Sequence, residues 1–429
     1  MQKTKPAWMG KMIRTAKRRG ERGQTMILVA ISIVSLLAMA ALAIDVVTLY
    51  VASSEIKRAA DAAALAGAKG IADSGVTTLS LSDPEFPTAR DNVAVPMANA
   101  AIAAILPANT VAGAQPAMPS PPVFDWSRQG NPLITVSLQQ SNLPTFFARI
   151  WGRSGSTVSA SSVAEVYNPS NNSSYAPIAP TAVKPWLVAN ADLDQPGNQF
   201  IQTGNLVETN AIGETFDLTP DCNPFGFPSN CQLWHQPLHP GEYVPALVAS
   251  NTVNNVCPSC SAGIDFEQSI SCADMTTSYL CGAGGASWDQ SVNPGGFSQP
   301  TALGTECLIH ATGPGLNAGQ DQLYFPPFPT GPPQITANSG PYSGSLVSTS
   351  SSVVTLPIVD PASVTQNVPP VTVVGFMQAF INQVGYGSAG KINITVLNIA
   401  GCIGTSNSNP PVVGGRGTSP VAVRLIAAP

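Results

Sequence analysis

Charged residues are scarce in this chain, where Asp, Glu, Lys and Arg make up 10% of the 429 residues. An ordinary soluble domain has about 25%. Histidine is limited to three residues, and the two with metal-ligand spacing, His235 and His239, enclose Pro237, which argues against the helix that such a pair needs. The chain also lacks a phosphate loop, a dinucleotide-binding glycine motif and a serine-hydrolase elbow. We therefore expect a protein without enzymatic activity, metal ion or cofactor.

Charge is absent altogether between Met26 and Ile44. Together with Thr25, these residues would form a helix about 30 Å long, which matches the hydrocarbon thickness of a bilayer. The apolar core of a cleaved signal peptide is shorter, at about 7–15 residues. We therefore predict one uncleaved transmembrane helix over residues 24–45, ending at Asp45.

A basic leader, residues 1–23, precedes this helix and has eight basic residues against one acidic residue, a net charge of +7. Positively charged flanks stay in the cytoplasm, so we predict a single-pass protein with its N-terminus inside and its bulk outside the membrane. Because the whole chain has a net charge of −5, the part beyond the leader has −12. A nucleic-acid-binding surface needs the opposite sign, which excludes nucleic acid as a partner.

The helical pattern continues beyond Asp45. Residues 46–69 contain no proline, and seven of the ten residues 59–68 are alanine. Small residues at helical spacing predict a packing face, which consists of Ile56, Ala60, Ala63 and Gly67. This face suits packing either on the chain's own domain or against neighbouring subunits. Asp45 is compatible with solvation at the membrane surface or with pairing to a positive group on a partner.

Helical and strand patterns alternate after the anchor and predict an α+β fold. Residues 46–167 are expected to form one α+β module, whose second helix, over residues 88–106, is interrupted at Pro96. The other elements expected in this module are a short aromatic helix over 143–151 and strands over 133–138 and 157–167.

Composition changes after this module. Residues 168–182 read as a linker, and residues 183–340 as a cysteine-containing region rich in strands and loops. Residues 351–429 are expected to be β-rich. Their predicted elements are strands over 351–360, 391–402 and 419–429, with strands followed by a short amphipathic helix in 368–384.

All the cysteines lie in the late part of the chain, at positions Cys222, Cys231, Cys257, Cys260, Cys272, Cys281, Cys307 and Cys402. An even number confined to the exported part predicts disulfides in an oxidising compartment. The spacing leaves the pairing open, although Cys222–Cys231 and Cys272–Cys281 would each close a small loop. We expect the two cysteines of the Cys-x-x-Cys sequence at 257–260 to be structural rather than zinc ligands or a redox pair.

Two other classes of protein remain possible at this point. A surface-binding or glycan-binding module would be favoured if Trp186, Trp234 and Trp288 were exposed on one face. An anchored hydrolase would need a carboxylate pair, for which the candidates are Asp217, Glu242, Asp265, Glu267 and Asp289.

The order of residues from Gly23 to Gly70 is specific enough to suggest a family. Arg22-Gly23-Gln24 precedes the apolar run, Ile44-Asp45-Val46 ends it, and the sequence Ala-Asp-Ala-Ala-Ala-Leu-Ala-Gly follows over residues 60–67. This stretch resembles the N-terminal domain of TadG-like proteins of the Flp (Tad) pilus-assembly system. Residues 143–166 are similar to the region that closes the pilin-like module in related proteins, and residues 351–384 look like the C-terminal part of longer members.

The resemblance implies a bacterial inner-membrane protein with a pilin-like α+β module, exposed to the periplasm or cell surface. Its partners would be pilin or other pilus-assembly subunits. Two features depart from related patterns. The fifth position after Gly23 is Leu28, whereas prepilin-type processing usually requires glutamate there, and the Asp-x-Ser-x-Ser metal motif of von Willebrand factor A domains is absent.

Overall fold

The computed structural model divides the chain into two compact units. The first unit consists of residues 1–59, 109–119 and 138–160, and the second of residues 60–108, 120–137 and 161–429. The structure describes residues 21–145, 155–170, 178–195, 197–202, 207–221, 237–250, 257–258, 260, 263–291, 294–310, 319–365, 368–385, 390–402, 412–413 and 419–426. Residues 1–20 of the basic leader therefore lie outside the described residues, as does most of the predicted aromatic helix.

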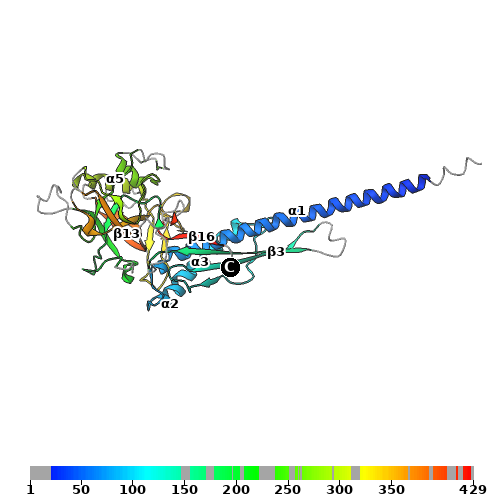
Figure 1. Ribbon diagram of the computed structural model, residues 1–429, viewed down its shortest axis with the longest axis horizontal. Coiled ribbons are helices and arrows are strands. Elements are labelled where there is room, and N and C mark those ends of the chain that lie inside the picture. Colours follow the sequence, from blue (N-terminus) through cyan, green and yellow to red (C-terminus); the bar gives the residue numbers. More distant parts are fainter. Residues whose placement is uncertain are drawn as a thin grey trace, which may run out of the picture. The chain divides into compact units, whose positions relative to one another are not determined.

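One helix, α1 (Glu21–Asp73), runs for 53 residues and is about 80 Å long at 1.5 Å per residue (Figure 1). It contains no proline and is rich in alanine, the residue with the highest helix propensity. The helix ends where Ser74 Oγ donates to the carbonyl of Ile71 (2.6 Å) and Gly75 takes a left-handed φ of 75°. The predicted continuation of the helix beyond Asp45 is confirmed.

Next come α2 (Phe86–Ala89), a π-helical turn (Arg90–Ala94) and α3 (Val95–Ile105). The interruption predicted at Pro96 therefore lies just before that proline. Pro96 occupies the first turn of α3, where a missing backbone N–H costs no helical hydrogen bond.

A four-stranded sheet lies in the order β1 (Val123–Asp125), β2 (Leu133–Leu143), β3 (Ser156–Tyr167), β16 (Ala422–Ile426). The C-terminal strand β16 closes one edge of the sheet and pairs antiparallel with β3, as the sequence allowed. Arg424 and Glu165 are opposite each other in this register, and Arg424 Nε donates to the buried Glu165 carboxylate at 2.6 Å. This cross-strand ion pair holds the chain's last strand in place.

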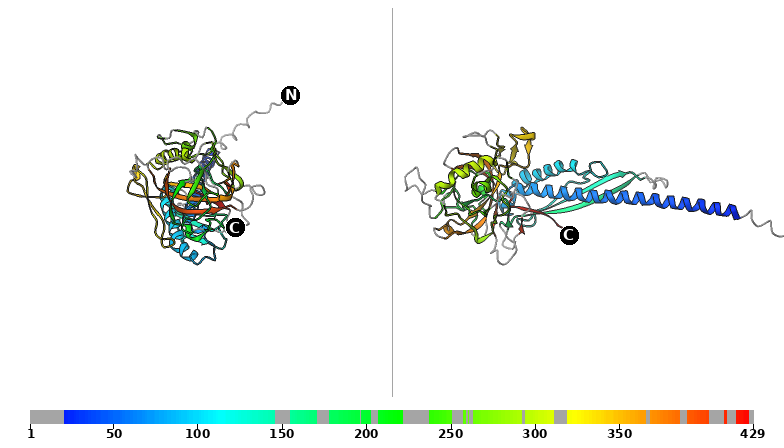
Figure 2. Two further views of the ribbon diagram at one scale, coloured as in Figure 1. Left: turned by 90° about the vertical axis from the view of Figure 1, so that its left-hand side faces the viewer. Right: turned by 90° about the horizontal axis from the view of Figure 1, so that it is seen from above.

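A second sheet contains seven strands in the order β12-β5-β7-β6-β14-β13-β8, and β12 also pairs with β13. Six of the strands therefore form a closed barrel, which leaves no free edge among them. The strands are β5 (Trp186–Ala189), β6 (Thr215–Pro220), β7 (Glu242–Pro245), β8 (Gly282–Ser287), β12 (Val353–Val359), β13 (Pro370–Val384) and β14 (Ile392–Gly401). Both the predicted region 183–340 and the predicted region 351–429 supply strands, so the connector between them separates no folding units. Figure 2 shows β13 and β14 side by side.

The amphipathic helix predicted at the end of 368–384 is wrong, because this segment belongs to strand β13. Its edges are hydrogen-bonded to β12 and β14, and its two faces are buried in different clusters. Met377, Ala379 and Ile381 belong to the barrel core, whereas Phe376 packs in a cluster outside the barrel. A strand buried on both faces has an almost continuous apolar sequence, which the spacing alone does not distinguish from a helix.

Three disulfides link the β-rich region: Cys257–Cys272, Cys260–Cys307 and Cys281–Cys402. The suggested pair Cys272–Cys281 is therefore wrong, and Cys222 and Cys231 lie outside the described residues. The first two disulfides end in or next to two short helices that the sequence did not predict, α4 (Asp265–Ser271) and α5 (Ser298–Leu308). As expected, both cysteines of the Cys-x-x-Cys sequence are structural, each bonded to a more distant cysteine.

Lys184 secures the same region from inside. Its buried ammonium group donates to the carbonyls of Ile270 (2.6 Å) and Cys272 (2.7 Å) at the C-terminal end of α4. A cation at this end of a helix satisfies carbonyl groups that have no helical partner. Burial lowers the pKa of Lys184 to about 7, against the opposing effect of Asp274.

Candidate membrane anchor and packing helix

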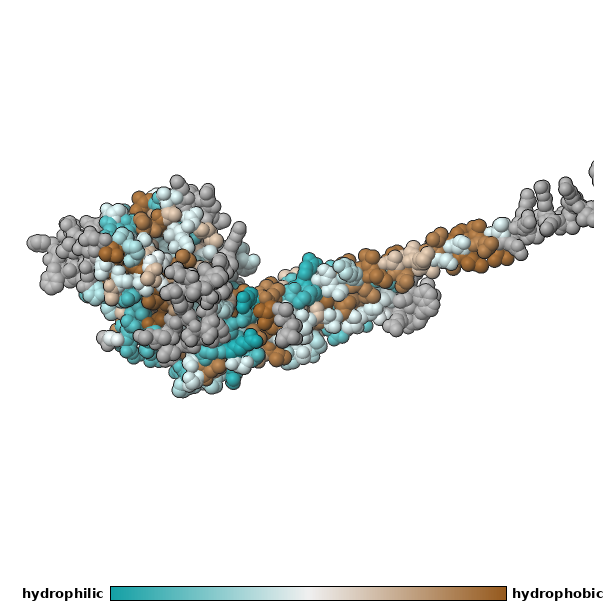
Figure 3. Space-filling view, in the orientation of Figure 1, coloured by the Kyte–Doolittle hydropathy of each residue, from teal (hydrophilic) through white to brown (hydrophobic). Residues whose placement is uncertain are grey.

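The first half of α1 exposes an apolar surface. Met26 is 78% exposed and Leu36 is 62% exposed, and every residue from Thr25 to Ala40 is classed as exposed. Figure 3 shows hydrophobic residues along this part of the helix. Large exposed apolar patches are rare on soluble proteins, and a helical one of this length fits a bilayer.

Two described segments are long and apolar enough to span a membrane, Thr25–Asp73 and Phe86–Ala108. In the most apolar window of the first, 6% is buried inside the fold, against 28% in the second. The second segment comprises α2 and α3, whose Ala98 and Ile102 are buried in the fold. The first half of α1 is therefore the candidate anchor.

One side of α1 becomes covered from Ala41 onward. Ala41, Asp45, Ala52 and Ile56 are 5% exposed or less, and their spacings of four, seven and four residues place them on one face. Asp45 is among these covered residues, with its side chain 5% exposed. Large apolar residues on the remaining helix surface, such as Val47, stay exposed.

A loop of the first unit contacts α1 in this part. The Glu55 carboxylate accepts a hydrogen bond of 2.8 Å from the backbone N–H of Ala112. The loop is itself held by a two-way backbone bridge between Val111 and Ala114. Ala112 has a left-handed φ of 49°, so the contact depends on a local backbone conformation that sequence spacing does not reveal.

The predicted small-residue face is buried in the chain's own fold. Ile56, Ala60 and Ala63 are 0% exposed, and Gly67 is buried. A Cβ atom on Gly67 would lie 2.5 Å from Ile134 Cδ1 of β2 and 3.0 Å from Ile102 Cδ1 of α3. Packing on the chain's own domain thus accounts for this part of the face, and neighbouring subunits would need another surface.

Gly70 extends this face and was not singled out by the sequence. A Cβ atom there would lie 2.8 Å from the backbone of Ala98 in α3. Because the neighbouring atoms are backbone, a change of side-chain rotamer cannot relieve this contact. Figures 1 and 2 show α3 alongside this end of α1. The signal was available, since Gly67 and Gly70 are three residues apart and small residues at helical spacing permit close helix contact.

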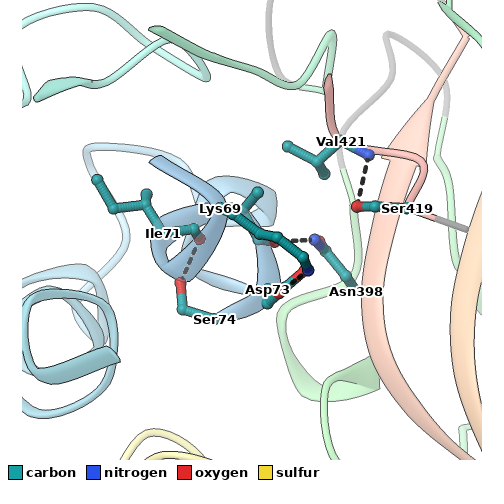
Figure 4. Close-up of polar contacts among 8 residues, drawn as sticks. Lys69, Ile71, Asp73, Ser74, Asn398, Ser419 and Val421 are labelled. Carbon is teal, nitrogen blue, oxygen red and sulfur yellow. Dashed lines mark hydrogen bonds and ion pairs between the residues drawn. The ribbon is translucent and has the colours of Figure 1, made fainter. Parts of the chain in front are cut away.

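Polar contacts fix the C-terminal end of α1 in the second unit. Asn398 of β14 donates from Nδ2 to the carbonyl of Ala72 at 2.6 Å, near the Lys69–Asp73 ion pair and the Ser74 cap (Figure 4). Asp61 lies one turn after Lys57, and its carboxylate accepts a hydrogen bond of 2.6 Å from Ser162 Oγ of β3. No local pattern predicts the Asn398 contact, because the two partners are 326 positions apart.

The structure accounts for several of the candidate residues for other activities. Trp186 and Trp288 are buried at 0% and 1% exposure, so neither belongs to an exposed aromatic face, and Trp234 lies outside the described residues. Asp217 is bound by Asn393 and Lys391, whose hydrogen bonds lower the pKa of its carboxyl group. Among the described residues, no group of three or more His, Cys, Asp or Glu side chains is arranged to hold a metal ion.

Comparison with known proteins gives one match. Neither the curated proteins nor the solved structures include a match to this chain. A family model described as "Putative Flp pilus-assembly TadE/G-like" matches residues 23–70. The matched segment begins at the start of the anchor and ends at Gly70, where α1 meets α3. The predicted resemblance to TadG-like Flp pilus-assembly proteins is thereby confirmed for the N-terminal helix.

Proposed function

We propose that this chain is a non-enzymatic, membrane-anchored accessory protein for the assembly or anchoring of Flp (Tad) pili. The observation that supports this most directly is the coincidence of the matched residues 23–70 with α1. In its first half this helix exposes an apolar surface suited to lipid, and in its second half it is packed into the folded chain. A helix of this kind attaches a folded domain to a membrane without a flexible linker.

The direction of insertion follows from charge. The leader has a net charge of +7 and the remainder of the chain −12. The positive-inside rule then supports a cytoplasmic leader and a disulfide-containing second unit beyond the inner membrane. The three disulfides support the same direction, since disulfides persist in the oxidising periplasm or outside the cell.

The mechanism in this proposal is assembly rather than chemistry. The α1–α3 contact and the four-stranded sheet are compatible with the pilin-like α+β module that the family resemblance implies. Because the small-residue face is already covered, pilus subunits would contact α1 on its exposed side just after the anchor, where Val46, Val47, Tyr50 and Val51 are 47–76% exposed. Apolar side chains of this size suit a helix-to-helix contact at the membrane surface.

Fractionation of cells that contain a C-terminally tagged copy tests this proposal. We expect full-length protein in the inner membrane, with the tag accessible from the periplasm, and fewer surface filaments in a strain without the gene. A shortened form in mechanically sheared filaments would instead indicate processing and incorporation as a minor pilin. Protein recovered in the cytoplasm, or filaments unaffected by its loss, would contradict the proposal.

A further inference from the structure

A small sheet of the second unit has an exposed face of mixed aromatic and amide side chains. The sheet is ordered β11 (Leu346–Val347), β10 (Gln334–Thr336), β9 (Gln322–Tyr324). Residues directly opposite each other in an antiparallel sheet share a face, so the register places five side chains together: Gln322, Tyr324, Gln334, Thr336 and Leu346. Tyr324 is 65% exposed, which leaves its ring available to a ligand.

A pocket of about 320 Å³ adjoins this face. Its walls are Gln320, Asp321, Gln322, Leu323, Phe380 and Asn382. The volume lies at the small end of the range for ligand sites, about 300–1,000 Å³. Gln322 lines the pocket, and Tyr324 follows two residues later on the same face of β9, outside the set of lining residues.

Amide groups in the wall retain hydrogen-bonding capacity. Gln320 is 5% exposed, and its Nε2 donates to the carbonyl of Asn382, but its buried Oε1 accepts no hydrogen bond from the described residues. The Nδ2 of Asn382 donates to Asn393 Oδ1 (2.9 Å) and Thr395 Oγ1 (2.8 Å), which leaves its Oδ1 to accept from a ligand. A buried polar atom without a partner costs free energy, which a bound donor would recover.

The chemistry of the pocket selects its ligand. The single carboxylate, Asp321, already accepts from the Asn338 N–H (3.2 Å) and Ser350 Oγ (2.6 Å), and no cationic side chain lines the wall among the described residues. An anion therefore lacks a counter-charge, and an apolar ligand would leave the amides unpaired. Amide oxygens and nitrogens beside an aromatic ring match adjacent hydroxyl groups and the apolar face of a pyranose.

We propose that this pocket binds an uncharged saccharide of about one or two pyranose rings, a size that suits its volume. The sugar hydroxyls donate to Gln320 Oε1 and Asn382 Oδ1 and exchange hydrogen bonds with the exposed Gln322 amide. Tyr324 packs on the ring face. This inference rests on the β9 face and its pocket alone, and it holds whether or not the chain takes part in pilus assembly.

The test is calorimetric titration of the full-length protein in a detergent without a sugar headgroup, such as lauryldimethylamine oxide. The probes are maltose, cellobiose and N,N′-diacetylchitobiose, with digalacturonic acid as the charged control. At least one neutral probe is expected to bind with a Kd of about a millimolar or below, and digalacturonic acid at least about tenfold more weakly. Gln322→Ala and Tyr324→Ala are each expected to weaken binding by at least about tenfold.

Tyr342→Ala is the matched control, because Tyr342 is 67% exposed in the turn between β10 and β11 but does not line the pocket. It should leave the Kd unchanged within about twofold. Both tested residues are exposed, so unchanged thermal unfolding of the variants will separate a lost contact from a lost fold. The proposal is overturned if no neutral probe binds, if digalacturonic acid binds equally well, or if Gln322→Ala and Tyr324→Ala bind like the control.

Discussion

Two apolar runs of this chain differ in structure and in exposure: Met26–Ile44 and strand β13 (Pro370–Val384). The first is a helix with every residue from Thr25 to Ala40 exposed, and the second is a strand in which most residues are buried. Both runs avoid charge. They differ in what surrounds them, because a helix satisfies all its backbone hydrogen bonds within itself, whereas a strand needs partners on both edges. Apolar sequence therefore predicts exclusion from water, and the neighbours decide the conformation.

The largest loss of stability is expected from a substitution in the buried strand β13. Replacing Phe376 of β13, which is 0% exposed, with alanine should lower the free energy of unfolding by about 3–5 kcal/mol, because it leaves a cavity outside the barrel. Thermal unfolding of the full-length protein in detergent measures this loss. Leu36→Ala in the anchor is the control and should not change the unfolding temperature, since Leu36 is 62% exposed. Equal effects of the two substitutions would show that the runs are not in different environments.

A charge in the anchor should affect membrane insertion rather than the free energy of unfolding. Leu36→Arg places a cation near the middle of the anchor, which costs about 2.5–3.5 kcal/mol of membrane insertion. We expect a large fall in the membrane-bound fraction, measured by carbonate extraction, with Leu36→Ala as the uncharged control. If the arginine variant associates with the membrane as fully as the wild type does, the first half of α1 is not the anchor.

Two glycines in the packed part of α1, Gly67 and Gly70, test the contrast between its exposed and packed parts. Gly70→Ala should destabilise the fold by about 1–3 kcal/mol, because the added Cβ would meet the backbone of Ala98, which has little freedom to move. Gly67→Ala meets only the ends of the Ile134 and Ile102 side chains, which can change rotamer, so its effect should be smaller. Chemical denaturation of both variants decides the order. A larger loss for Gly67→Ala would contradict the packing described here.

The smallest expected effect concerns pH. Burial, followed by the negative charges of Asp192 and Asp194, raises the pKa of Glu214 from 4.5 to about 7. Between these values the folded chain keeps a proton that the unfolded chain releases, so the stabilising contribution is present below pH 4.5 and is lost as the pH rises through 7.

Substitution Glu214→Gln removes this titration. The unfolding temperature of the variant, relative to the wild type, should therefore rise between pH 4.5 and pH 8. Asp217→Asn is a useful comparison, because the pKa of Asp217 is lowered and its loss should destabilise the protein over the same range. A constant difference between Glu214→Gln and the wild type across this range would contradict the raised pKa.

Much of the architecture followed from local pattern. The long helix, the strands at 133–138, 157–167, 351–360 and 391–402 and the C-terminal strand all occur where alternation or helical spacing predicted them. The residues of the predicted small-residue face are buried along α1. What it packs against was left open, because spacing reports which residues share a face and not which element covers them.

The errors share one cause. The helix predicted within 368–384 and the suggested Cys272–Cys281 pair were each judged from nearby residues. Their true partners are distant in sequence, as in Cys281–Cys402, which closes a separation of 121 residues. Pairing of cysteines and strands depends on which segments the fold brings together, and the 105 possible pairings of eight cysteines look alike from spacing.

Local sequence was enough to predict an apolar helix long enough to span a membrane, the continuation of α1 and the family resemblance over residues 23–70. These properties depend on residues close together in the chain, where helical geometry and transfer into lipid act locally. Only the tertiary structure decided the closed barrel, the disulfide pairing, the burial of Asp45 and the contacts of Gly70 and Asn398. Each of these depends on segments far apart in sequence that meet only when the chain folds.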